Sequence, residues 1–245
     1  MTAASRSACN PALGRPSRGT LALKRALDVL GSAVGLFILS PLFLAIAIAI
    51  KFDSPGEVLF RQVRVGRDGR PFRIFKFRSM VVSAPLLGTA LTVRADSRIT
   101  RVGAFLRRCK LDELPQLLNV LAGDMSLVGP RPEFPEFMNF YAPEEREIIL
   151  SLRPGMTDYA AILFRDESSL LDGTNDPIET YRREIMPIKF AYYQRYSHDV
   201  GLLNDLRIIV ATILLLAFKQ VPKSLGIEHE LWTDPETKRE QQTRQ

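Results

Sequence analysis

The stretch Leu111-Asp112-Glu113-Leu114-Pro115-Gln116 places two adjacent carboxylates where a helix is expected to begin. Leucines then recur at the i, i+3, i+4, i+7 spacing of one apolar helix face: Leu114, Leu117, Leu118 and Leu121. Pro115 falls in the first turn, where its missing N–H is tolerated, and Gly123 follows as a stop signal. Asp112 and Glu113 are therefore expected at the positive end of a helix dipole, which holds carboxylates ionised and attracts phosphate.

This acidic pair has two interpretations. Two carboxylates beside an anion-binding helix end are suited to a nucleophile with a helper, or to a Mg²⁺ site. Asp and Glu are also common in the cap and first turn of ordinary helices, where they have only a structural role. The segment by itself leaves both interpretations open, and the rest of the chain has to decide between them.

Composition and charge indicate a membrane and an anionic partner. The 245 residues have a formal net charge of +6 and a pI near 9.5, which favours a phospholipid surface, a nucleotide or a nucleic acid. The mean hydropathy of +0.01 is high for a chain with 24% charged residues, and the apolar residues are concentrated in 26–50. With only two histidines, a histidine-based zinc site or a Ser-His-Asp triad is disfavoured.

The N-terminal part of the chain is expected to contain a disordered leader and a membrane helix. Residues 1–20 are polar and aperiodic, and they do not have the pattern of a signal peptide. Residues 21–51 are long enough to cross a bilayer, which needs about 20 residues. However, Ser40-Pro41 lies in their middle, and positive charge is dense on both sides. A helix-break-helix that enters one leaflet and returns accounts for both facts, and a simple kinked span remains the alternative.

Residues 52–222 are expected to form one domain, followed by a flexible charged tail at 223–245. A hairpin with a turn at 66–69 is predicted within 57–80, because Asp-Gly and the flanking aromatic residues favour a turn there. Apolar periodicity and boundary residues predict further helices at 99–108, at 143–152, from 177 to about 183, and at 202–218.

Two features of this domain concern membranes and phosphate. The aromatic residues at 190–196 are of a kind often found at a membrane interface, and 202–218 reads as an amphipathic helix lying on the membrane or the core. Pro130 and Pro132 stiffen the backbone around Arg131, whose guanidinium fork matches phosphate geometry.

The order and spacing of several motifs resemble the bacterial monotopic phosphoglycosyl transferases, also called the bacterial sugar transferase family. The resemblance covers about residues 22–220 and is to the compact form, without a large multi-span region. The matching stretches are 24–28, 40–41, 75–80, 106–107, 111–116, 123–132, 154–157 and 205–218. After 154–157 the chain departs from the continuation that many relatives carry, so the identity of the sugar stays open.

The resemblance implies a reaction and roles for particular residues. A sugar-1-phosphate would pass from a UDP-sugar to a polyprenyl phosphate, usually undecaprenyl phosphate, with Mg²⁺ required and UMP released. This is the first membrane step of a bacterial surface glycan. Asp112 would be the nucleophile that forms an aspartyl phosphosugar intermediate, and Glu113 would hold Mg²⁺ or deprotonate the lipid phosphate. Four basic residues match phosphate-holding or nearby basic positions of the family: Arg107, Arg131, Lys76 and Arg78.

The resemblance also implies an α+β fold and a topology. A re-entrant membrane helix, bent at Ser40-Pro41, would precede a small, mainly helical domain with a β-hairpin and interfacial amphipathic helices. The protein would be monotopic on the cytoplasmic face of the inner membrane, in contact with its lipid, and the oligomeric state is left open. No nucleic-acid motif is present, so nucleic acid is not expected as a partner. The rival hypothesis is a non-catalytic, membrane-anchored basic binding protein, which would release no UMP.

Overall fold

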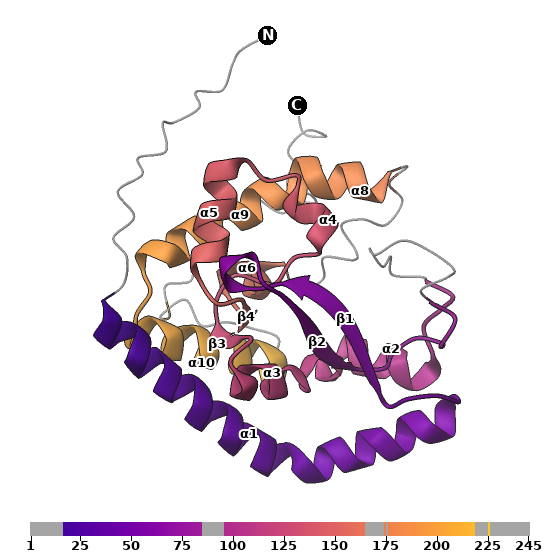
Figure 1. Cartoon of the computed structure of the whole chain (residues 1–245). Helices are drawn as coiled ribbons and strands as arrows, with labels where there is room; N and C mark the ends of the chain where they lie inside the picture. The colour runs from indigo at the N-terminus through magenta and orange to yellow at the C-terminus, as the bar shows by residue number, and fades with distance from the viewer. Residues whose placement is uncertain (1–16, 85–95, 165–173, 175, 219–224, 226–245) are drawn as a thin grey trace, which may run out of the picture.

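The computed structural model of the chain describes residues 17–84, 96–164, 174, 176–218 and 225. It combines helices with two small two-stranded sheets, which confirms the expected α+β class (Figure 1). The leader expected at 1–20 and the tail expected at 223–245 lie almost entirely outside the described residues.

Helix α1, Arg18–Asp53, is the one helix among the described residues that is long and apolar enough to cross a membrane. It is a single α-helix through Ser40 and Pro41, so an interruption of the helix at this pair is not seen. Figure 1 shows instead that α1 bends in its middle as it follows the domain. Pro41 has no N–H for the carbonyl of Phe37, and the Ser40 hydroxyl donates to that oxygen at 2.8 Å. The pair therefore bends the helix without ending it.

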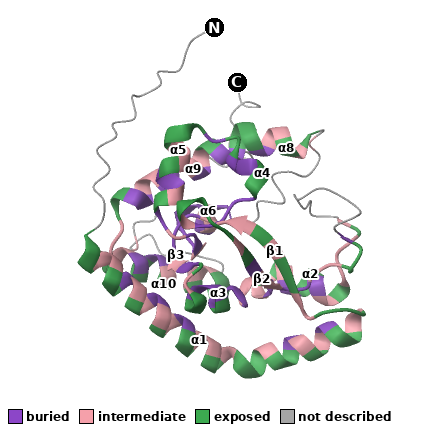
Figure 2. Ribbon diagram, in the orientation of Figure 1, coloured by how far each residue is buried: buried purple, intermediate pink, exposed green. Residues whose placement is uncertain are grey.

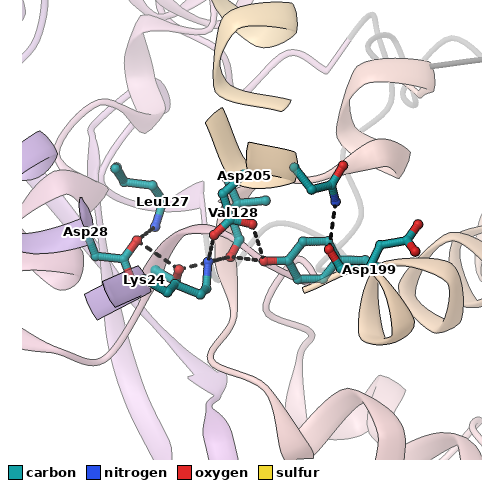
Figure 3. Close-up of polar contacts among 9 residues, drawn as sticks. Lys24, Asp28, Leu127, Val128, Asp199 and Asp205 are labelled. Atoms are coloured by element: carbon teal, nitrogen blue, oxygen red, sulfur yellow. Dashed lines mark hydrogen bonds and ion pairs between the residues drawn. The ribbon is translucent and has the colours of Figure 1, made fainter. Parts of the chain in front are cut away.

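The N-terminal half of α1 is attached to the domain by buried polar contacts (Figure 3). Lys24 Nζ lies 2.5 Å from Asp205 Oδ2 and donates to the carbonyl of Val128 at 2.8 Å. One turn further on, Asp28 Oδ1 accepts the backbone N–H of Leu127 at 2.9 Å. These contacts hold the start of α1 against the centre of the domain.

The C-terminal half of α1 is attached mainly by apolar packing. Ile46 and Ile50 are buried in one cluster with Phe77 and Leu106. At the end of the helix, Asp53 Oδ2 accepts the backbone N–H of residue 102 at 3.0 Å. Both ends of α1 therefore contact the same domain, while much of the helix between them is exposed (Figure 2).

The predicted hairpin is confirmed. Strands β1, Leu59–Val65, and β2, Pro71–Phe77, pair antiparallel with Leu59 opposite Phe77 and Val65 opposite Pro71. The turn is a short 3₁₀ segment, η1, Arg67–Gly69, in which Asp68 and Gly69 have φ values of 57° and 74°. Gly and Asp tolerate this left-handed backbone better than most residues, which explains their place in the turn.

A second sheet was not predicted. Strands β3, Ser126–Val128, and β4, Gly155–Thr157, pair in parallel with Ser126 opposite Gly155. The two backbones approach closely, because a Cβ on Gly155 would lie 2.1 Å from the nitrogen of Gly129. The sheet thus brings together the stretches 123–132 and 154–157, which lie far apart in the sequence.

Helices surround these strands. The elements near α1 and the hairpin are α2, Arg101–Arg108, the 3₁₀ turn η3, Leu111–Glu113, and α3, Gln116–Ala122. The others are α4, Pro135–Met138, α5, Pro143–Ser151, α6, Tyr159–Leu163, α8, Pro177–Thr180, the π-helical turn η4, Tyr181–Ile185, α9, Met186–His198, and α10, Leu202–Phe218. The helices predicted from 99, 143, 177 and 202 are confirmed, whereas α4 and α6 were not predicted.

The aromatic residues of α9 form the core of the domain, so the membrane interface expected for 190–196 is wrong for three of them. Tyr192, Tyr193 and Tyr196 are at most 1% exposed and belong to the largest apolar cluster. The reason is tertiary: α5 and α6 pack against α9 and cover these rings, which only the assembled helices can do.

Candidate functional site

The acidic pair lies in η3, ahead of α3 and not in its first turn. Helix α3 begins at Gln116 with Pro115 as its N-cap residue, and Lys110, with φ of 58°, turns the chain into η3. Pro115 was expected in the first turn and is instead the N-cap residue, so the acidic pair lies one short 3₁₀ turn ahead of the start of α3. Because α3 has only seven residues, its dipole is a minor part of their environment.

Asn119 of α3 aligns the acidic pair with the hairpin. Its side-chain carbonyl accepts the N–H of Phe75 at 2.9 Å, and its amide donates to the carbonyl of Arg73 at 2.8 Å. These bonds replace the strand partner that β2 lacks on this edge. They fix β2 against α3 so that Lys76, which follows Phe75, reaches Glu113.

Glu113 is held between two cations. Lys76 Nζ lies 2.7 Å from Glu113 Oε1. Arg131 Nη1 donates to Oε2 at 3.0 Å, and its Nη2 pairs with Oε1, so the guanidinium binds the carboxylate through two nitrogens. Burial raises the pKa of Glu113, but Arg131 and Lys76 outweigh that effect and hold the pKa well below its ordinary value. Glu113 is therefore ionised, and it positions both cations.

Asp112 has a contrasting environment. It is buried, at 7% exposed, and its Oδ1 makes no hydrogen bond with any described residue. Burial and the neighbouring charge of Glu113 raise its pKa, while Lys76 and Arg107 oppose the shift. An under-bonded carboxylate in a poorly solvated place is a stronger nucleophile than a fully hydrogen-bonded one.

Arg131 is positioned by Asp158, which lies just after 154–157, where the chain departs from many relatives. The backbone N–H of Arg131 donates to Asp158 Oδ2 at 3.1 Å, and Asp158 also caps α6 by accepting the N–H of Ala161. Burial raises the pKa of Asp158 to about 6 against these hydrogen bonds. Asp158 therefore connects the Arg131 loop to α6.

The six residues predicted for catalysis or for phosphate binding line one cavity of about 1140 Å³, which opens between the hairpin and the acidic pair. They are Lys76, Arg78, Arg107, Asp112, Glu113 and Arg131. The guanidinium of Arg78 is engaged elsewhere, because it donates to the carbonyls of Ser54 and Pro55 at 2.7 and 2.6 Å. Arg78 thus fastens the connection between α1 and β1, and its role toward phosphate stays a prediction.

Other cations line this cavity that the sequence analysis did not single out as site residues. They include Arg64, Arg98, Lys110 and Lys189. Arg64 lies over the ring of Phe134, 3.4 Å from its centroid, and burial lowers its pKa to about 10 although Glu133 opposes the shift. The clustering of Arg and Lys in 61–78 indicated that the hairpin could line a basic site. No comparable pattern in the sequence indicated that Lys189 would line the same cavity.

Among the described residues, no three His, Cys, Asp or Glu side chains converge on a point where they could hold a metal ion. A metal here would have at most the two carboxylates of the acidic pair. Mg²⁺ is commonly bound by one or two carboxylates together with substrate phosphates and water, and the carboxylate of Asp112, which lines the cavity, fits that mode. Both oxygens of Glu113 already have cationic partners.

The site has the character of a phosphate-processing centre, with a basic cavity, an under-bonded carboxylate and a neighbouring carboxylate that orders two cations. The chain matches the family described as bacterial sugar transferase over residues 19–219, and it therefore belongs to that family.

Several curated relatives carry names within this chemistry. The chain is 41% identical to a UDP-glucose:undecaprenyl-phosphate glucose-1-phosphate transferase of Caulobacter vibrioides, over 78% of this chain and 68% of the relative. It is 38% identical to the exopolysaccharide production protein PSS of Rhizobium leguminosarum bv. phaseoli, over 79% of this chain and 94% of the relative. It is 44% identical to a UDP-N-acetylgalactosamine-undecaprenyl-phosphate N-acetylgalactosaminephosphotransferase of Aeromonas hydrophila, over 58% of this chain, and spans 34% of that relative's length.

Proposed function

We propose that this protein transfers a sugar-1-phosphate from a UDP-sugar to undecaprenyl phosphate, a transfer of the kind that its relatives' names describe for them. UMP is the product released by this transfer. The observation that carries the proposal is Asp112, a buried carboxylate with one oxygen that no described residue hydrogen-bonds, in the lining of a cavity whose basic side chains outnumber its acidic ones. Such a cavity attracts a diphosphate and offers it a nucleophile.

In the first half-reaction, an oxygen of ionised Asp112 attacks the β-phosphorus of the UDP-sugar. A bond forms between that oxygen and the phosphorus, and the bond to the oxygen that bridges the two phosphates breaks. UMP leaves, and the sugar phosphate remains on Asp112. Lys76 and Arg131, held in place by Glu113, neutralise the charge on the phosphate oxygens.

In the second half-reaction, an oxygen of the lipid phosphate attacks the same phosphorus. The bond to Asp112 breaks, the carboxylate is regenerated, and the sugar leaves on a polyprenyl diphosphate. One site thus handles two chemically different acceptors in turn, which is the advantage of a covalent intermediate. Glu113 is too strongly paired to accept a proton readily, and its low pKa favours an organising role over that of a base.

Mg²⁺ belongs to this proposal as a cofactor. The residues that would hold it are Asp112, through its carboxylate, and Glu113 if it shares an oxygen with its cations. When bound, the ion would supply further neutralisation of the diphosphate charge.

We also propose that α1 enters the cytoplasmic leaflet and returns, so that both of its ends lie on the cytoplasmic side of the inner membrane. Two observations support this topology. Lys24 at one end and Asp53 at the other both bond to the same domain, and α1 bends between them. A straight 36-residue helix is about 54 Å long, and if it entered the bilayer along its normal it would place its two ends on opposite sides.

Cysteine labelling in intact cells tests the topology. Thr20→Cys and Glu57→Cys are made singly in a chain in which Cys9 and Cys109 are replaced by Ser. Neither cysteine should react with an impermeant maleimide until the cells are opened. Labelling of Thr20→Cys from outside would establish a spanning helix instead.

A donor panel tests the activity. The purified protein in nanodiscs is given Mg²⁺, undecaprenyl phosphate and each of several UDP-sugars, and UMP is measured. We expect UMP with at least one donor, and exchange of labelled UMP into that donor without any acceptor. If no donor releases UMP although the protein binds UDP, the rival hypothesis of a basic binding protein is favoured.

A further inference from the structure

A smaller, mostly apolar cleft lies on the other side of the wall that contains Glu113 and Arg131. It has a volume of about 240 Å³ and lies between α6 and α10. Its apolar lining includes Met156, Ile162, Phe164, Ile209, Ile213 and Leu216. Four polar residues border both this apolar cleft and the large basic cavity: Lys110, Glu113, Arg131 and Lys189. The apolar cleft therefore ends at the side chains that organise the phosphate chemistry.

The walls of the apolar cleft are held by specific contacts. The hydroxyls of Thr157 and Thr212 lie 2.6 Å apart and join β4 to α10. The start of α10 is fixed by Asp205, whose Oδ2 pairs with Lys24 and whose Oδ1 accepts from Tyr196 at 2.8 Å (Figure 3). The cleft is thus a preformed part of the fold.

The outer edge of the apolar cleft is continuous with an exposed apolar surface. Ile213 and Leu216 line the cleft and are nevertheless 58% and 42% exposed. Val210 and Leu206, about one and two turns before Ile213 on α10, are also exposed. Helix α10 lies beside α1, the candidate membrane helix (Figure 1). An apolar surface of this kind marks contact with lipid or a partner.

The inner end of the apolar cleft has the opposite character. Three cations line this end, namely Lys110, Arg131 and Lys189, against the two carboxylates of Glu113 and Asp158. Tyr193 also borders the cleft; it is fully buried, and its hydroxyl makes no hydrogen bond with any described residue. The cleft thus suits a ligand with an anionic head and a branched hydrocarbon chain.

We propose that this apolar cleft binds the isoprene units nearest the phosphate of the polyprenyl phosphate acceptor, with the phosphate at the shared wall. The inference rests on the proposed function, and it gives the acceptor of that reaction a binding site in the apolar cleft. A UDP-sugar has no hydrocarbon chain to fill the cleft, and the large basic cavity is available for it. The two substrates would therefore meet at the wall formed by Glu113 and Arg131, next to Asp112, which lines the basic cavity.

Variants that narrow the cleft from its two walls test the assignment. Ala161→Leu acts from α6 and Ile213→Trp from α10, and both residues border the cleft. We expect each variant to raise the KM for undecaprenyl phosphate by about tenfold or more, the effect of losing a few buried methylenes. The exchange of labelled UMP into the UDP-sugar, which needs no acceptor, should change by less than about twofold.

Val210→Trp is the matched control, because Val210 is on the exposed face of α10 and does not border the cleft. It should leave the acceptor KM unchanged. An unchanged acceptor KM in both cleft variants, with wild-type exchange, would overturn the assignment. An equal rise in the control would also overturn it, since general lipid contact by α10 would then be the cause. Absence of exchange in the wild-type protein would instead refute the proposed function.

Discussion

Two groups of buried carboxylates in this molecule, Asp205 under α1 and the Asp112–Glu113 pair in the basic cavity, differ in how completely they are hydrogen-bonded. Under α1, Asp205 has both oxygens bonded, one to Lys24 and one to Tyr196. In the basic cavity, Glu113 is bonded in the same complete way, but its neighbour Asp112 keeps one oxygen without a partner among the described residues. The difference separates an anchor from a reactive group, because a satisfied carboxylate stabilises and an unsatisfied one is free to react.

The largest expected effect is the loss of activity when Asp112, the carboxylate with an unbonded oxygen, is replaced. Asp112→Asn keeps the shape of the side chain but removes the nucleophile, so donor turnover should fall by about 10⁴-fold or more. The thermal midpoint should stay the same or rise, because the buried charge is removed. UMP release and thermal unfolding of the purified variant measure the two effects. Near-normal turnover would refute the nucleophile assignment.

Replacing a member of the Lys24–Asp205 pair should instead lower the stability of the fold. Lys24→Met leaves Asp205 buried without its cation and should cost about 3–5 kcal/mol of unfolding free energy. The double variant Lys24→Met/Asp205→Leu should recover much of that loss, which thermal unfolding in detergent can follow.

An exposed pair provides the control for this experiment. Arg182 and Glu179 form an ion pair on the surface, so Arg182→Met should hardly change the unfolding midpoint. If Lys24→Met is equally harmless, the buried contact is not an anchor.

A smaller effect distinguishes two arginines of the cavity. Arg131→Lys loses the two-nitrogen contact with Glu113 and should lower donor turnover by about 10²-fold at little cost in stability. Arg78→Lys loses contacts to the Ser54 and Pro55 carbonyls and should mainly lower the unfolding midpoint. Loss of turnover at an unchanged midpoint in Arg78→Lys would instead indicate contact with substrate.

The smallest effect is a shift in pH dependence. Asp112 must be ionised to attack, and its pKa is raised by burial and by Glu113. The rate of UMP exchange should therefore rise with pH through a pKa above the ordinary value of about 4 for Asp, and be lost below it. Lys110 lowers this pKa, so Lys110→Met should move the acidic limb to higher pH. If the acidic limb of the pH–rate profile does not move in Lys110→Met, a group other than Asp112 controls the rate at low pH.

The comparison of the two clusters also shows how far sequence reasoning reaches. Local patterns were sufficient for the hairpin and for α2, α5 and α10. The resemblance to a family supplied the hypothesis that Asp112, Glu113, Lys76 and Arg131 work together, and these four residues line one cavity. The parallel pairing of β3 with β4 was not predicted, because each strand has only three residues and the partners are about 29 positions apart. The membrane interface assigned to 190–196 was wrong for the buried tyrosines, since composition does not reveal what covers a helix.

The sequence by itself determined the family-specific motifs, the apolar N-terminal helix and the basic character of the cavity, because these depend on residue type and near-neighbour spacing. Only the tertiary structure decided that Glu113 is paired while Asp112 keeps a free oxygen. It alone showed that Ser40 keeps α1 helical across Pro41, and that an apolar cleft meets the basic cavity at Arg131. These features depend on burial and on contacts between distant segments, and neither property can be read from a local pattern.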